Sequence, residues 1–157
     1  MIRPFIDSDL AAIHAIQAKC PQAAQWREED YLRLARDAAG LILVAEVPGA
    51  DPEETSGFAA FHRLGEEAEL HNLAVDPVHQ RKGIARALLA EGFRRMREFD
   101  VQWVFLEVRA SNQPATVLYA SLGFRVLHIR RNYYQNPEDD GLVMRADINE
   151  YRARRQD

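Results

Sequence analysis

The sequence predicts one domain of mixed α/β class, and three observations lead to that prediction. The 157 residues are 47% hydrophobic and 28% charged, which allows one full hydrophobic core and excludes a disordered or fibrous chain. Seven segments have the short apolar or alternating pattern of strands, whereas four have apolar residues at helical spacing. No repeat, low-complexity tract or long linker divides residues 1–157, which are therefore expected to form a single domain.

The first elements are bounded by recognisable start and stop residues. A strand at 2–6 precedes Asp7, which is expected to cap a helix whose apolar residues are three apart and which Pro21 ends. A second helix at 26–38 has acidic residues in its first turn, as the helix dipole favours, and a glycine ends it. A nearly continuous apolar run at 41–47 predicts a buried strand.

Three strands without an intervening helix are expected in the middle of the chain. An acidic connection rich in turn residues follows the strand at 41–47 and leads to two further strands at 57–64 and 67–75. A tight loop at 65–66 joins these two strands, so the three segments are expected to form an antiparallel meander. A long amphipathic helix follows at about 83–99, with its apolar residues on one stripe.

The last elements are a strand, a helix and two further strands. A strand at 101–108 precedes a helix at 112–122, which carries a proline in its first turn and ends at a glycine. Two strands at 124–131 and 142–148 complete the pattern, and a loop at 132–141 joins them.

A basic loop that contains a glycine joins the strand at 67–75 to the long helix. Helix N-termini expose unpaired N–H groups and the positive end of the helix dipole, and Gly83 lets the backbone come close to an anion. We therefore expect a phosphate group to bind at this point. The loop and the first helical turn consist of Gln80, Arg81, Lys82, Gly83, Ile84, Ala85 and Arg86.

Two side chains in the C-terminal half are candidates for proton transfer. Glu107 shares a strand face with Trp103 and Phe105, where desolvation is expected to raise the pKa of a carboxylate toward that of a general base. A surface glutamate at a strand end fits the same pattern equally well. Tyr119 lies among apolar residues, as a core tyrosine would, and Asn112 is placed to cap the helix at 112–122.

Several stretches together resemble a known enzyme superfamily. The sequence LAVDP at 73–77, followed by QRKGIA at 80–85, is similar to the Q-x-x-G-x-G/A motif of the GCN5-related N-acetyltransferases (GNAT), with Ala85 in the last glycine position. The stretches LEVRASN, LYASLGF and IRRNYY resemble the RimI-type ribosomal-protein alanine N-acetyltransferases, a group within this superfamily. The similarity covers about residues 69–148, or roughly half of the chain.

This resemblance implies the GNAT fold, a mixed and mostly antiparallel sheet of about seven strands flanked by four helices. It also implies acetyl-CoA as the co-substrate, and no metal is expected. The residues implied for the pantetheine are Leu73, Ala74 and Val75, and those implied for the pyrophosphate are Arg81, Lys82, Gly83, Ile84, Ala85 and Arg86, with Asn112 as a further contact.

The resemblance further implies direct acetyl transfer to a protein N-terminal α-amine. The N-terminal alanine of a ribosomal protein is the expected acceptor. Glu107 occupies the position of the general base and Tyr119 that of the general acid. Glu69 is a competing base, because related acetyltransferases take a base from this strand, and His71 projects on the same strand face as Glu69.

Three features of the sequence bear on which amine is the acceptor. Only Trp26 remains of the Phe-Pro-Trp-type stretch between the first two helices, a region that lines the peptide groove in this subfamily. Tyr133 and Tyr134, expected in the loop at 132–141, would border the same groove or only cover the sheet edge. Acidic residues in two loops suit a basic acceptor, so a lysine side chain or a polyamine is an alternative. These residues are Glu53, Glu54, Glu138, Asp139 and Asp140.

Composition and length argue against several other classes of protein. A formal net charge of −4 argues against a direct nucleic-acid partner. The apolar runs fall short of the about 20 residues that cross a bilayer, and the N-terminus lacks a signal-peptide core. Cys20 is the single cysteine, interpreted as a structural thiol, and a cytoplasmic monomer is expected. A non-catalytic acyl-CoA-binding module stays open, although candidates for both a base and an acid disfavour it.

Two groups of arginines are not assigned to the site, and both are interpreted as solvated surface. Arg94, Arg95 and Arg97 on the long helix fit a solvated helix face better than a binding patch. The second group lies near the C-terminus among acidic residues. It consists of Arg152, Arg154 and Arg155.

Overall fold

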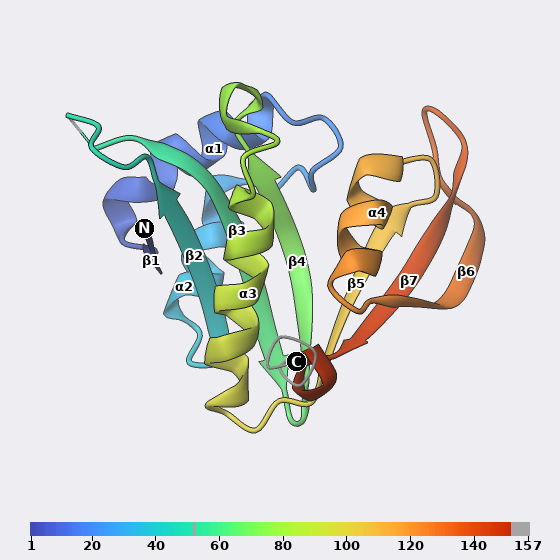
Figure 1. Cartoon of the computed structure of the whole chain (residues 1–157). Coiled ribbons are helices and arrows are strands. Elements are labelled where there is room, and N and C mark those ends of the chain that lie inside the picture. The colour runs from blue at the N-terminus through green and yellow to red at the C-terminus, as the bar shows by residue number, and fades with distance from the viewer. Residues whose placement is uncertain (52, 152–157) are drawn as a thin grey trace.

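A seven-stranded sheet forms the centre of the computed structural model, which describes residues 1–51 and 53–151 (Figure 1). In these residues the strand order is β1-β2-β3-β4-β5-β7-β6, and only β4 and β5 are parallel neighbours. This architecture confirms the predicted fold class. The strands are β1 (Ile2–Pro4), β2 (Gly40–Glu46), β3 (Thr55–Leu64), β4 (Glu67–Val75), β5 (Trp103–Arg109), β6 (Arg125–Tyr134) and β7 (Asp139–Asp147). The helices are α1 (Leu10–Ala18), α2 (Glu28–Arg36), α3 (Ile84–Arg97) and α4 (Gln113–Ser121), with 3-10 turns η1 (Asp7–Asp9) and η2 (Pro77–His79).

Two apolar clusters hold the helices on opposite faces of the sheet (Figure 1). On one face, Ile13 of α1 and Tyr31 of α2 belong to one cluster with Phe58 of β3. On the other face, Phe93 of α3 belongs to a larger cluster with Phe61 of β3, and α4 joins this cluster too. Because successive side chains of a strand point to opposite faces, β3 supplies both clusters from alternate positions.

The parallel pairing of β4 with β5 is short. It consists of Glu67 with Trp103, Ala68 with Val104 and Glu69 with Phe105. Beyond these positions the two strands diverge, although β4 continues to Val75 and β5 to Arg109 (Figure 1). The C-terminal half of β4 therefore has a strand neighbour on the β3 side only.

A β-bulge in β4 changes the direction of the side chains that follow it. Leu70 pairs with Phe61, but Asn72 pairs with Ala60, so His71 is one extra residue in this strand. Leu70 consequently lies in the cluster below α3, whereas Asn72 reaches Tyr31 on the side of α1 and α2. Without the extra residue, strict alternation would place these two side chains on the same face.

Asp9 rather than Asp7 organises the start of the first helix. Asp7 lies inside η1, so its predicted role as helix cap is wrong. The buried carboxylate of Asp9 accepts the Ile6 N–H at 2.8 Å and the Arg3 guanidinium at 2.8 Å. Burial alone would raise the pKa of Asp9, but these two partners together lower it.

The C-terminal hairpin is longer than predicted. β6 extends to Tyr134 and β7 starts at Asp139, so residues 135–138 alone connect them, and the predicted loop at 132–141 is wrong. Tyr133 and Tyr134 accordingly lie in β6 and not in a loop. Asn132 has a left-handed φ of 52°, and the pairing register shifts around it, so the alternation that marks a strand is interrupted there.

Other boundaries differ less from the predictions. The second helix begins at Glu28 instead of residue 26, because Trp26 lies outside the helix and packs against Tyr31 with 5.1 Å between ring centroids. The strands and helices in the middle of the chain match the predicted order. The arginines near the C-terminus, at positions 152, 154 and 155, lie outside the described residues.

The arginines of α3 form ion pairs and hydrogen bonds with neighbouring residues of the protein. Arg94 contacts both Glu91 and Glu98, at 2.7 and 2.8 Å, and Arg95 contacts Glu91 at 2.9 Å. Arg97 donates to the backbone carbonyl of Ile148 at 3.1 Å. These contacts favour the interpretation of a solvated, ion-paired helix face over a binding patch.

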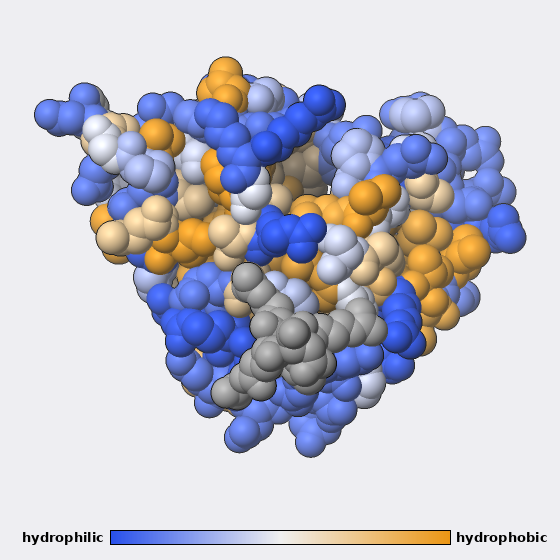
Figure 2. Space-filling view, in the orientation of Figure 1, coloured by the Kyte–Doolittle hydropathy of each residue, from blue (hydrophilic) through white to orange (hydrophobic). Residues whose placement is uncertain are grey.

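Apolar surface gathers over α4 and β6 (Figure 2). β6 lies at the edge of the sheet, and three of its apolar side chains are exposed together with one from α4. They are Val126, Leu127 and Ile129 from β6 and Val117 from α4. Among the described residues, none of the helices is long and apolar enough to cross a membrane.

We expect Gly92→Ala to destabilise the protein. A Cβ atom at position 92 would lie 2.3 Å from the ring of Phe61, so α3 can approach β3 this closely only because residue 92 has no side chain. Overpacking of this kind costs about 1–3 kcal/mol, which exceeds the about 1 kcal/mol that alanine contributes as a better helix former. Denaturant unfolding measures the difference.

A double-mutant cycle provides the control for this prediction. Phe61→Leu removes the ring that the added methyl group would meet, so the two substitutions together should cost less than the sum of their separate effects. An equal or greater stability of Gly92→Ala alone would contradict the proposed close contact.

Candidate active site

A cleft of about 870 Å³ lies where β4 and β5 diverge. Six segments line it: the connection between α1 and α2, the second half of β4, the loop before α3, the end of β5, α4, and the end of β6. Of the catalytic and cofactor-binding residues predicted for the site, all except Lys82 and Glu69 line this cleft. Those present are Leu73, Ala74, Val75, Arg81, Gly83, Ile84, Ala85, Arg86, Glu107, Asn112 and Tyr119.

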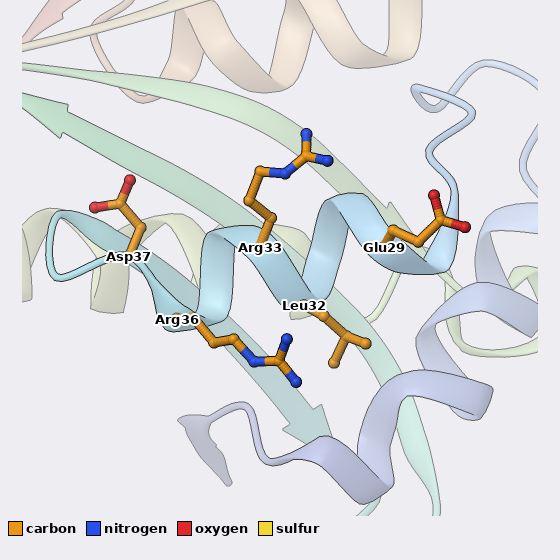
Figure 3. A pocket seen from close by; sticks show the side chains of 5 residues that line it. All are labelled: Glu29, Leu32, Arg33, Arg36 and Asp37. Atoms are coloured by element: carbon orange, nitrogen blue, oxygen red, sulfur yellow. The ribbon is translucent and has the colours of Figure 1, made fainter.

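A second hollow, of about 470 Å³, lies on the surface of α2 (Figure 3). Its lining comes almost entirely from this one helix, and Arg33 and Arg36 point in different directions from it. None of the predicted site residues lies there. The chemistry predicted from the sequence therefore belongs to the cleft between the diverging strands.

The free edge of β4 presents backbone groups to the cleft. The Asp76 N–H bonds to the Ser56 carbonyl on the β3 side at 2.8 Å, so alternation turns the N–H groups of Leu73 and Val75 toward the cleft. The Val75 carbonyl points the same way, because it accepts from Gln80 Nε2 at 3.1 Å. An extended ligand can hydrogen-bond to such an edge as another strand would.

Cys20 contributes to the same wall of the cleft. Its thiol donates to the Val75 carbonyl at 3.4 Å, and burial together with the nearby charge of Asp76 raises the pKa of Cys20. The thiol is therefore protonated and weakly nucleophilic at neutral pH. This environment agrees with the structural role predicted for Cys20.

The loop before α3 has the backbone shape of an anion site. Arg81 and Gly83 have left-handed φ angles of 64° and 81°, and Gly83 is the N-cap of α3 without a side-chain cap. Left-handed residues within a turn gather successive N–H groups toward one side, where they can surround an anion. A Cβ atom at position 83 would meet nothing within 4 Å, so the backbone angle and not space requires glycine there.

The turn that leads into this loop is held by Asp76. Its carboxylate accepts the Val78 N–H at 3.1 Å and the Lys19 ammonium at 3.0 Å. Burial opposes ionisation of Asp76, but these partners keep its pKa below the ordinary value. At the start of α3, Arg86 donates to the Ser121 hydroxyl of α4 at 2.7 Å, which ties the anion loop to the opposite wall.

Glu107 lies on the face of β5 that points away from the apolar cluster of α3 and α4. Its neighbours Leu106 and Val108 belong to that cluster, whereas the Glu107 side chain is 28% exposed and pairs with Arg130 of β6 at 3.1 Å. Glu107 thus shares a strand face with Trp103 and Phe105, as predicted, but this face is exposed at Glu107 and the carboxylate is paired with an arginine instead of being desolvated. Arg130 was missed because it lies on β6, which is separated from β5 by β7, and the sequence does not give this strand order.

Tyr134 completes this part of the cleft. The Arg109 guanidinium lies over its ring, 4.4 Å from the centroid. Burial, and then the negative charge of Glu107, raise the pKa of Tyr134. Tyr134 lines the cleft, whereas neighbouring Tyr133 is 48% exposed.

Tyr119 is buried in α4 and opens on the cleft. Its side chain is 8% exposed, its ring meets that of Phe124, and burial raises its pKa well above the ordinary value. Within residues 1–51 and 53–151, no hydrogen bond engages the hydroxyl of Tyr119. The hydroxyl thus keeps its proton at neutral pH. Asn112 caps α4 as predicted, accepting the Ala115 N–H at 3.4 Å, and also lines the cleft.

The two competing base candidates differ in position. Glu69 is part of the last parallel pair at the base of the divergence, and it does not line the cleft. His71 does line the cleft, with its ring 5.6 Å from that of Trp26 and its Nδ1 3.9 Å from the Glu69 carboxylate. The predicted common face of Glu69 and His71 is confirmed by this contact.

The fold and cleft define the class of this protein. The model of the Acetyltransferase (GNAT) family matches residues 10–124, which is well over half of the chain. The chain therefore belongs to the GNAT family, and the predicted superfamily is confirmed.

Two relatives show which members of the GNAT family this chain is similar to. The [ribosomal protein bS18]-alanine N-acetyltransferase of Escherichia coli (strain K12) is 43% identical over 95 residues, which cover 59% of this chain and 64% of the relative. The N-alpha-acetyltransferase RimI of Mycobacterium tuberculosis is 41% identical over 95 residues, or 58% of each chain. These matches span less than two thirds of the relatives' own length.

Solved structures extend the likeness over almost the whole chain. The ribosomal-protein-S18-alanine N-acetyltransferase from Escherichia coli has a TM-score of 0.79 at 33% identity, covering 94% of this chain and 93% of that one. A spermidine N-acetyltransferase from Vibrio cholerae has a TM-score of 0.81 at 21% identity, covering 98% of each chain. The second likeness concerns the fold alone, so the fold is common to proteins named for different acceptors.

Proposed function

We propose that the protein transfers the acetyl group of acetyl-CoA to the α-amine at a protein N-terminus, with an N-terminal alanine of a ribosomal protein as the expected acceptor. One observation carries this proposal: a free strand edge and an anion loop share one cleft with an ionisable carboxylate and a buried tyrosine. The likeness to a ribosomal-protein-S18-alanine N-acetyltransferase over most of the chain supports the choice of acceptor.

The residues present fit acetyl-CoA, which supplies an activated thioester. Its linear pantetheine arm suits the cleft-facing N–H group of Val75, and the diphosphate suits the left-handed turn at Arg81 and Gly83. Lys82 lies outside the cleft lining but is exposed beside this turn, where it adds positive charge. The same strand edge can donate to the thioester oxygen as it gains charge.

The acceptor amine must be neutral before it can attack. An α-amine has a pKa of about 7.7–8.0 and a lysine about 10.4, so deprotonation at pH 7 costs about 1 kcal/mol for the first and about 5 kcal/mol for the second. One carboxylate is sufficient for the first task. Glu107 is the proposed proton acceptor, and its partner Arg130 keeps the carboxylate oriented in the cleft.

The proposed reaction moves two protons while one bond forms and another breaks. The amine nitrogen bonds to the acetyl carbon and loses a proton to Glu107, and the bond between this carbon and the CoA sulfur breaks. Tyr119 donates its hydroxyl proton to the departing thiolate, which suits a buried tyrosine whose raised pKa keeps it protonated.

The acidic residues that suggested a basic acceptor are largely engaged within the protein. Asp139 accepts from the Ser111 N–H at 3.1 Å and from its hydroxyl at 2.6 Å. Asp140 accepts from the Asn132 N–H at 2.9 Å, and Glu54 pairs with His79 at 3.3 Å. These bonds weaken the case for a polyamine or a lysine side chain as the acceptor.

A panel of acceptors tests the proposed function. We expect release of CoA thiol with a peptide that begins with alanine, and much less with peptides whose only amine is a lysine side chain or with spermidine. The same alanine peptide with a blocked N-terminus is the control. Turnover of spermidine or the lysine peptide alone would overturn the α-amine proposal, and acetyl-CoA binding without any thiol release would indicate a non-catalytic module.

Glu107→Gln is expected to reduce kcat by about 100-fold or more, because the amide cannot accept the proton of the amine. Acetyl-CoA affinity, measured by calorimetry, should stay near the wild-type value. A near-wild-type rate would instead assign the base to His71, to Glu69 or to a chain of waters.

Tyr119→Phe is expected to slow transfer by about 100-fold while the affinity for acetyl-CoA changes little. Because burial raises the pKa of Tyr119, its ionisation should not lower the wild-type rate below about pH 10, the ordinary pKa of tyrosine. Rates across this pH range and binding titrations check both points. Loss of acetyl-CoA binding in this variant would mean that the tyrosine serves the packing of α4.

A further inference from the structure

The side chain of Asn72 uses its full hydrogen-bonding capacity inside the protein. Asn72 is 4% exposed and donates from Nδ2 to the Ala24 carbonyl and to the Tyr31 hydroxyl, at 2.9 Å each. Its Oδ1 accepts the N–H groups of Ala24 at 3.1 Å and of Leu73 at 3.0 Å. An amide can donate two hydrogen bonds and accept two, so Asn72 is fully satisfied.

The connection between α1 and α2 is held at two points by this network. Asn72 binds both backbone groups of Ala24, as a neighbouring strand would. The buried Gln17 side chain accepts from the Tyr31 hydroxyl and donates to the Trp26 carbonyl at 2.8 Å. Residues 20–25 of this connection line the cleft, so the network fixes one cleft wall to β4.

Residues 20–25, which Asn72 holds, and Glu107, the proposed proton acceptor, line the same cleft. The parallel pair Glu69 and Phe105 sets the register of β4 against β5, and two residues further along each strand are His71 and Glu107. Ala24, Asn72 and Glu107 all line this cleft, and Asn72 directly precedes the Leu73–Val75 edge. This is the part of the cleft where an acceptor amine would approach the thioester.

The β-bulge at His71 is what makes this contact possible. It turns Asn72 toward α1 and α2, whereas strict alternation would direct the amide into the apolar cluster below α3. A bulge beside a cleft commonly redirects one side chain in this way. Here the redirected side chain connects residues 20–25, which form the proposed acceptor side of the cleft, to β4, whose edge is proposed to bind acetyl-CoA.

We propose that Asn72 is a positioning residue that fixes the segment at Ala24 on β4 and thereby shapes the acceptor side of the cleft. This inference rests on the proposed acetyl transfer. Asn72 also holds the cleft-facing N–H of Leu73, which a bound pantetheine would otherwise use. Removing the Asn72 side-chain amide should therefore make residues 20–25 more mobile, while the Leu73 N–H becomes available to acetyl-CoA.

Asn72→Ala tests the proposal, with Tyr31→Phe as the matched control. Both variants remove buried hydrogen bonds and are expected to be less stable, but Tyr31→Phe keeps both bonds between Asn72 and Ala24. We expect Asn72→Ala to raise the KM for the acceptor peptide about 10-fold or more, because the variant loses both buried hydrogen bonds between Asn72 and Ala24. The control should stay within about 3-fold, and acetyl-CoA affinity should be unchanged or slightly tighter in Asn72→Ala.

Hydrogen exchange of the Ala24 amide gives a readout that does not depend on turnover. It should be faster in Asn72→Ala by about 10-fold or more and close to wild type in Tyr31→Phe, at a temperature where both are folded. Wild-type protection of Ala24 in Asn72→Ala, an equal rise of KM in both variants, or weaker acetyl-CoA binding would each overturn the proposal.

The two proposals fail in different ways. If the wild-type protein acetylates none of the peptides, the α-amine function fails, and the KM comparison is then made with whichever amine is turned over. If peptides are acetylated but Asn72→Ala keeps the wild-type KM, the role of Asn72 fails alone. Faster exchange at Ala24 with an unchanged KM likewise contradicts a positioning role.

Discussion

The short pairing of β4 with β5 is the constraint on which the rest of the structure depends. Three parallel residue pairs join these strands, and beyond Glu69 each strand follows its own half of the sheet. An unpaired strand edge inside a folded protein must find other hydrogen-bond partners or remain open to ligands. The divergence therefore creates the cleft and supplies its most important polar surface at once.

Apolar contacts compensate for the missing pairing. The larger cluster runs continuously from β2 and β3, under α3, to β5, β7 and α4, so it joins both halves behind the cleft. The smaller cluster encloses a polar network in which no buried side-chain nitrogen or oxygen of the described residues lacks a partner. Buried polar groups that are all satisfied make one arrangement far more favourable than its alternatives, which suits a wall that must hold a fixed position.

The sequence predicted the order of elements and most of the cleft residues, because helix and strand periods are local properties and the glycine loop has a local backbone requirement. Two features depend on distant residues and could not be predicted. The bulge at His71 is defined only by pairing with β3, and the ion pair of Glu107 with Arg130 needs the order of β5, β7 and β6. Each arises from tertiary register, which period and propensity do not encode.

In the part of the chain that the structure describes, three parallel residue pairs and the larger apolar cluster join the two halves of the sheet. Hydrogen bonds require fixed geometry, whereas packed apolar side chains tolerate small sliding displacements. Inside the halves, the pairings of β2 with β3, β3 with β4, β5 with β7 and β6 with β7 are longer than the pairing at the junction between the halves. A ligand that reaches from β4 to α4 would bind only the folded arrangement of this junction, so it would stabilise the folded chain by an amount that grows with its concentration relative to its Kd.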